Sequence, residues 1–134
     1  MNRNVILTIS GADDIETTVN AEYFKKGDSH YLLYEEEMEG FSQSSSNRIK
    51  FAKGRLELIR RGTVGTHMIF EENKKHMTRY LMPYGEIMLG IETKKVVLEE
   101  HRDFINVIVE YMLEMNGEPH AESRIEICAR ELPV

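Results

Sequence analysis

The chain lacks the features that mark secreted, membrane-spanning or disulfide-bonded proteins. Cys128 is its only cysteine, which excludes an internal disulfide and a cysteine-based zinc site. The first apolar run, residues 5–9, is too short for the core of a signal peptide and far too short to span a membrane. We therefore expect a cytoplasmic protein that has no membrane partner.

The sequence also lacks the common catalytic and nucleotide-binding motifs. No glycine-rich loop leads into a helix and no Ser stands in a G-x-S-x-G elbow, so P-loop, dinucleotide and α/β-hydrolase signatures are absent. The five histidines do not fall at spacings that would bring three or four metal ligands together on strands. We expect no cofactor and no metal, and spacing alone groups no nucleophile with a base, so an enzyme is the least supported reading.

Basic residues are fewer than acidic ones, 17 against 23, and they are unevenly distributed along the chain. The net charge of −6 disfavours general attraction to nucleic acid, and we expect no nucleic-acid partner. Residues 48–79, however, carry nine basic and three acidic side chains. This stretch is either a basic patch for an anionic partner or a solvated set of strand faces and loop tips.

Short alternating runs separated by glycines predict a meander of β-strands. The run at residues 15–24 places Val19, Ala21 and Tyr23 on one face. A two-residue turn at Gly27-Asp28 then pairs Phe24 with Tyr31. Residues 41–48, FSQSSSNR, are either a loop or a polar edge strand.

Two later hairpins predict which residues pair across neighbouring strands. A turn at Asn73-Lys74 aligns Phe70 with Met77. Residues 96–117 have both helical and alternating apolar spacings, but their β-branched residues favour a strand. A three-residue loop at residues 116–118 then sets Leu113 against Ala121 and Val109 against Ile125, so apolar residues face each other.

The size and strand count predict one all-β domain over residues 1–134. About eight to ten antiparallel strands in one sheet tend to close on themselves, since closure removes exposed edges. Pro83-Tyr84-Gly85 forms a corner between two strands, because Pro83 lacks a backbone donor and Gly85 tolerates positive φ. Gly90 suits a coiled strand in such a closing sheet. The expected architecture is an up-and-down β-barrel.

The same region resembles a known family. The stretch IRRGTVGTHMIFEENKKHMTRYLMPYGEIMLGIETKKV, the long strand ending in NG, and ESRIEI are similar to the YwiB-like proteins of Gram-positive bacteria. The resemblance extends from VILTISG to RIEI and implies a calycin or lipocalin-like barrel, a bacterial cytosolic setting and a domain of unknown function. The family pattern has TPYG where this chain has MPYG, so Met82 replaces a polar residue.

The interior of such a barrel is the best candidate for a binding site. We expect a small, partly apolar or anionic ligand in an enclosed volume of about 300 Å³ or more, with Arg79 reaching into it. The candidate ligand-binding residues are Met68, Phe70, Met77, Arg79, Tyr80, Tyr84, Met88 and Tyr111. The alternative is an interaction module or homodimer joined by an open strand edge, with neither ligand nor catalysis.

Overall fold

The computed structural model describes residues 3–11, 16–37, 44–62 and 65–132, without the side chains of Arg3, Glu37, Ser44 and Met82. The described part contains ten strands and no helix. The strands are β1 (Arg3–Ser10), β2 (Glu16–Lys26), β3 (Ser29–Glu37), β4 (Ser44–Ala52), β5 (Arg55–Arg61), β6 (Thr66–Glu71), β7 (Lys74–Met82), β8 (Gly85–Glu100), β9 (Phe104–Met115) and β10 (Glu118–Glu131).

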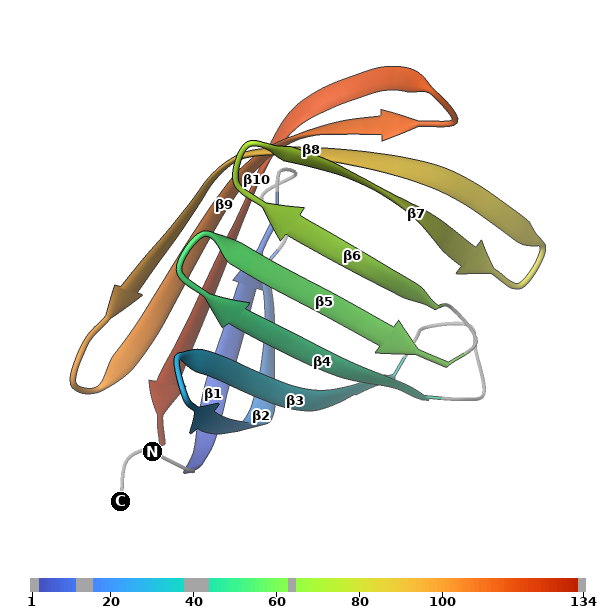
Figure 1. The fold of residues 1–134 in the computed structure, drawn as a ribbon. Helices are drawn as coiled ribbons and strands as arrows, with labels where there is room; N and C mark the ends of the chain where they lie inside the picture. Colours follow the sequence, from blue (N-terminus) through green and yellow to red (C-terminus); the bar gives the residue numbers. More distant parts are fainter. Residues whose placement is uncertain (1–2, 12–15, 38–43, 63–64, 133–134) are drawn as a thin grey trace.

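The strands form one antiparallel sheet that curls into a nearly closed barrel (Figure 1). Their order is β6-β5-β4-β3-β2-β1-β10-β9-β8-β7, so every neighbour but one is also the next strand in the sequence. The exception is β1, which pairs with β10 and joins the two halves of the meander. The prediction of an all-β antiparallel barrel is confirmed.

Alternation along the strands fills the barrel with apolar side chains. Val5, Leu7, Ala21 and Tyr23 are all buried, and they belong to one cluster with residues from every other strand except β7. The predicted strand at residues 105–115 is confirmed as part of β9, where Val107 and Val109 are fully buried. Contact between these inward faces, through the hydrophobic effect, is what drives closure of the sheet.

The local hairpin registers agree with the sequence. Phe24 pairs with Tyr31 across the turn at residues 27–28, and the two rings stack with centroids 4.7 Å apart. Leu113 pairs with Ala121 as expected, but the turn has two residues, Asn116 and Gly117. A register shift between Pro119 and Ala121 supplies the remaining residue, so the apolar pairing beyond it is unchanged.

The β6–β7 hairpin corrects a prediction. Its turn lies at Glu72-Asn73 and not at Asn73-Lys74, with Asn73 at φ 63°. The faces of β7 are set by its ladder with β8, which pairs His76 with the buried Ile91 and Met77 with Gly90. Phe70 is fully buried while Met77 is 54% exposed, and the predicted pairing of these two residues is wrong. Asn accepts positive φ far better than Lys, which places the turn one residue earlier.

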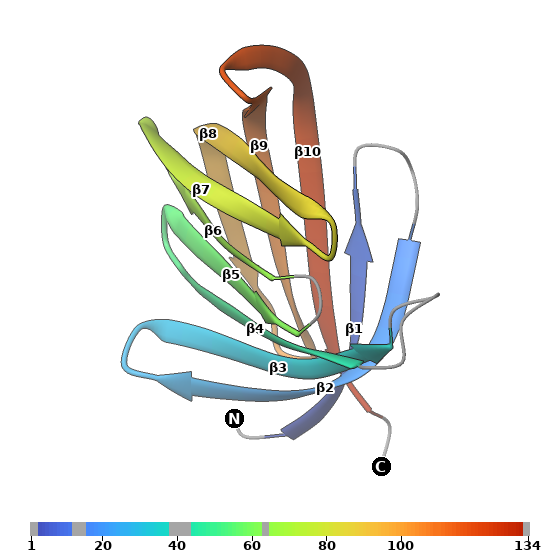
Figure 2. The same ribbon diagram turned by 90° about the vertical axis from the view of Figure 1, so that its right-hand side faces the viewer.

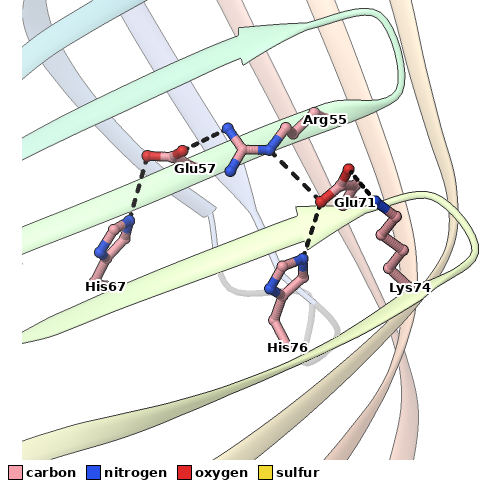
Figure 3. A network of polar contacts seen from close by, with 6 residues as sticks. All are labelled: Arg55, Glu57, His67, Glu71, Lys74 and His76. Atoms are coloured by element: carbon pink, nitrogen blue, oxygen red, sulfur yellow. Dashed lines mark hydrogen bonds and ion pairs between the residues drawn. The ribbon is translucent and has the colours of Figure 1, made fainter.

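Side-chain contacts link β6 and β7, which share no hydrogen-bonded ladder in the described part of the chain. Among the described residues, β6 and β7 share no ladder, only one bridge between Gly65 and Leu81. Near the turn, Glu71 of β6 contacts His76 Nε2 at 3.0 Å and Lys74 Nζ at 3.2 Å (Figure 3). Hydrogen bonds from His76 and Lys74 lower the pKa of Glu71, which keeps this carboxylate ionised.

Part of the serine-rich stretch belongs to an interior strand. Residues 41–43 lie outside the described residues, and Ser44 begins β4, which pairs with β3 on one side and β5 on the other. Ser45 and Asn47 are each 1% exposed, so the described half of this stretch is neither a loop nor an edge strand.

Candidate ligand-binding cleft

The barrel wall opens where β2 and β3 separate. Their ladder runs from Lys26 paired with Ser29 to Glu22 paired with Leu33 and ends there. Residues 16–21 continue beside β1, whereas residues 34–37 continue beside β4. Figure 2 shows the consequence: the first part of β2 runs beside β1, and β3 runs across it.

A groove of about 640 Å³ lies at this separation, and we call it the β2–β3 cleft. Its lining includes Asn4 and Leu132 from the two ends of the described chain, Asn20 to Glu22 of β2, Leu33 to Glu35 of β3, Ser46 to Arg48 of β4, and Ile59 and Arg61 of β5. Most of these side chains belong to the outer face, since their strand neighbours Val5, Leu32 and Ile49 point into the core. The cleft therefore lies in the wall of the barrel and not in its interior.

The cleft combines apolar surface with charges of both signs. Leu33 and Ile59 are half-buried and Leu132 is 38% exposed. Arg48 and Arg61 are exposed on one side, and Glu22 and Glu35 are exposed on the other. The guanidinium of Arg48 lies 5.8 Å from the Tyr31 ring centroid, which restricts its position.

Arg61 has no side-chain hydrogen bond or ion pair with any residue in the described part of the chain. The neighbouring Arg60 points inward instead and forms hydrogen bonds with Asn47 and Glu36. An unpaired guanidinium beside half-buried apolar side chains can bind a carboxylate, sulfonate or phosphate in two-point geometry.

A buried polar network fixes the floor of the cleft. Arg60 Nε donates to Asn47 Oδ1 at 3.0 Å, and a second nitrogen of Arg60 lies 3.4 Å from Glu36 Oε2. Asn47 in turn donates to Ser45 Oγ at 3.2 Å. Burial raises the pKa of Tyr34, although the positive charge of Arg60 opposes the shift. Since Tyr34 and Asn47 line the cleft, this network holds its floor in one arrangement.

The eight residues predicted to bind a ligand do not form one site. Phe70 is fully buried and meets the Tyr111 ring edge-on at 5.0 Å, and Met68 packs against the same core. Met77 and Met88 are 54% and 37% exposed on the outside, and Tyr84 in the Pro83-Tyr84 turn is 85% exposed. Tyr80 is half-buried.

Arg79 does not reach the barrel interior. It pairs with Met88, is exposed, and shares the outer face with Met77 and Leu81, as alternation predicted. The prediction that this face lines an enclosed space is wrong, because the ladder between β7 and β8 places Thr78 beside the buried Leu89 and Arg79 beside the exposed Met88. None of the eight residues lines the β2–β3 cleft, although Tyr111 lines a smaller groove with Lys94 and Glu122.

Sequence reasoning missed the cleft because no local pattern marks the point where two neighbouring strands part. Its one sequence signal was the excess of basic residues at 48–79, to which Arg48 and Arg61 belong. In the described part of the chain, no three His, Cys, Asp or Glu side chains come close enough together to hold a metal ion. Nor do the described residues include a helix of the length and hydropathy that a membrane span requires.

Comparisons with known proteins bear on the family and the fold. The crystal structure of the ywiB protein from Bacillus subtilis is similar, with a TM-score of 0.82, 20% identity, and coverage of 98% of this chain and 94% of that one. At this identity the likeness shows the fold alone. No curated protein sequence matches the chain. A family model described as "Domain of unknown function (DUF1934)" matches residues 2–127. The chain therefore belongs to the DUF1934 family, in agreement with its resemblance to YwiB-like proteins.

Proposed function

We propose that this protein binds a small, partly apolar ligand carrying an anionic group, and that the β2–β3 cleft is the binding site. The observation that carries the proposal is Arg61, which pairs with no side chain among the described residues, beside the half-buried apolar wall of Leu33 and Ile59. The groove volume of about 640 Å³ is within the range of about 300–1,000 Å³ that holds small ligands.

The charges of the cleft give the ligand an orientation. An anionic group lies toward Arg48 and Arg61 on the β4–β5 side. Hydroxyl or amine donors lie toward Glu22 and Glu35 on the side of β2 and β3, since those carboxylates only accept hydrogen bonds. The apolar part of the ligand covers Leu33 and Ile59, whose burial supplies the non-directional share of the affinity.

The fluorescent probe 1-anilinonaphthalene-8-sulfonate tests the proposal, since it is small, largely aromatic and anionic. We expect its fluorescence to rise on binding to the native protein, and Arg61→Gln to weaken its affinity about tenfold or more. That size follows from the loss of a charge-assisted hydrogen bond worth about 1.5–3 kcal/mol. Arg48→Gln weakens binding in the same direction.

Arg102→Gln is the matched control, because Arg102 is an exposed arginine between β8 and β9 and lies outside the cleft. It leaves the affinity of the probe unchanged if the cleft is the site. Equal binding by the native protein and the Arg61→Gln and Arg48→Gln variants contradicts the proposal. Native mass spectrometry of protein purified from its own host then identifies the natural ligand by mass.

A further inference from the structure

The outer face of the β7–β8 hairpin concentrates exposed apolar side chains. Of the five large hydrophobic residues that are exposed in the described part of the chain, four lie here: Met77, Leu81, Tyr84 and Met88. Their exposed fractions range from 37% to 85%. Clustered exposed apolar side chains, unlike scattered ones, mark interaction surfaces.

Two opposite charges stand at the corners of this face. The register pairs Arg79 with Met88 and Leu81 with Glu86, so Arg79 and Glu86 occupy one diagonal of a four-residue rectangle. Leu81 and Met88 occupy the other diagonal. Both Arg79 and Glu86 are exposed, and neither makes a hydrogen bond or ion pair with another described residue.

The backbone of this region does not offer a free edge to a partner strand at Leu81. Leu81 N donates to Gly65 O at 2.8 Å, and Gly65 N donates to Leu81 O at 3.0 Å. The other side of β7 is paired with β8 along its whole length. A partner must therefore pack against the side chains of the face instead of adding a strand at this point.

We propose that two copies of this chain associate through the outer β7–β8 face, related by a two-fold axis along the Leu81–Met88 diagonal. A rotation of 180° about this axis turns one copy over onto the other. It places Arg79 of each copy over Glu86 of the other copy. Leu81 then meets Leu81 and Met88 meets Met88 at the centre. The sides of the rectangle are about 5 Å and 7 Å, so both ion pairs are within side-chain reach.

Charge complementarity makes a second copy the fitting occupant. An isologous interface requires each surface group to find its partner on an identical surface. The rectangle of Arg79, Leu81, Glu86 and Met88 meets this requirement, because it carries one cation and one anion at positions that the axis exchanges. A uniformly acidic or basic partner would satisfy one of them and repel the other.

Sedimentation velocity over a series of protein concentrations tests the association, using the full chain at low ionic strength. We expect dimer that dissociates on dilution. Arg79→Glu and Glu86→Arg each place two like-charge contacts in the interface and weaken self-association at least tenfold. The double variant Arg79→Glu/Glu86→Arg restores it, because the pairs are re-formed with exchanged signs.

An equimolar mixture of the two single variants provides the decisive control. Each variant alone repels itself, but one carries two acidic and the other two basic corners, so the mixture forms a heterodimer. A native chain that stays monomeric throughout the series overturns the proposal. So does a double variant, or a mixture, that associates no better than the single variants. The proposal is independent of the β2–β3 cleft, which contains none of these residues.

Discussion

The hydroxyl of Tyr23 lies 2.6 Å from Nδ1 of His30 in the interior of the barrel. The other ring nitrogen of His30, Nε2, is 3.1 Å from the carboxylate of Glu100. Since a carboxylate only accepts, Nε2 carries the ring proton and Nδ1 accepts from the Tyr23 hydroxyl. The neutral histidine, which is 2% exposed and stacks on Phe51, thus has both nitrogens satisfied.

The substitution His30→Phe removes the hydrogen bond with Tyr23 and keeps an aromatic ring stacked on Phe51. Phenylalanine retains contact with Phe51 but leaves the buried Tyr23 hydroxyl without its acceptor, which costs about 1–3 kcal/mol of unfolding free energy. The double variant Tyr23→Phe/His30→Phe removes both polar partners and recovers most of that loss. Urea unfolding of the native protein and both variants measures this, and a double variant less stable than His30→Phe contradicts it.

His30 also makes stability depend on pH. Burial lowers the pKa of His30 below its usual value, although the charge of Glu100 opposes the shift. The unfolded chain therefore binds a proton more readily than the folded one, starting near the ordinary histidine pKa of about 6.5. We expect the unfolding free energy to fall as pH drops below about 6.5. In the double variant Tyr23→Phe/His30→Phe this decrease is smaller, as urea titrations at a series of pH values will show.

Glu72 stabilises an irregularity in β8. The register of β8 against β9 shifts between Thr93 and Lys95, and Glu72 Oε1 accepts a hydrogen bond from Val96 N at 2.9 Å. We expect Glu72→Ala to cost about 1–3 kcal/mol, because it leaves a partly buried amide without its acceptor. Glu72→Gln keeps an acceptor oxygen and should cost less than half as much in the same unfolding measurement. Equal losses in the two variants would argue against this role.

Gly90 is required by a close approach and not by its backbone angles. An added Cβ would lie 2.8 Å from Glu114 Oε2 and 3.3 Å from Glu114 Cβ. The same carboxylate is paired with Lys75 Nζ at 2.7 Å, so Glu114 must move and weaken that pair. Gly90→Ala should cost about 1 kcal/mol. In a Glu114→Ala background the substitution should cost less, because the 2.8 Å contact with the carboxylate is removed while the contacts with the Cβ of residue 114 and with Met77 Sδ remain, and a double-mutant cycle measures the coupling.

Many local features of the fold were predictable because they depend on neighbours in sequence. The alternation around Ala21 and Tyr23 determined which face is buried, and the glycine of Gly27-Asp28 determined the Phe24–Tyr31 pairing. Even the ambiguous residues 105–115 form a strand, as their β-branched side chains predicted. Period and turn chemistry act over a few residues, so the sequence carries them directly.

The candidate site was not predictable in the same way. Arg79 lies on the same face of β7 as Met77 and Leu81, as the alternation predicted. The sequence does not tell whether that face points to the core or to solvent. That depended on the pairing of β7 with β8, in which Leu89 and Ile91 point into the core and so do not share a face with Arg79.

The sequence by itself determined the strands, most of their hairpin registers and the excess of basic residues at 48–79. Only the tertiary structure decided that β2 and β3 part beyond Glu22 and Leu33, and that Arg61 faces the opening. Strand separation is a property of the whole curled sheet, because each strand follows the neighbour that buries its apolar face best. That competition involves residues far apart in the chain, which no local pattern records.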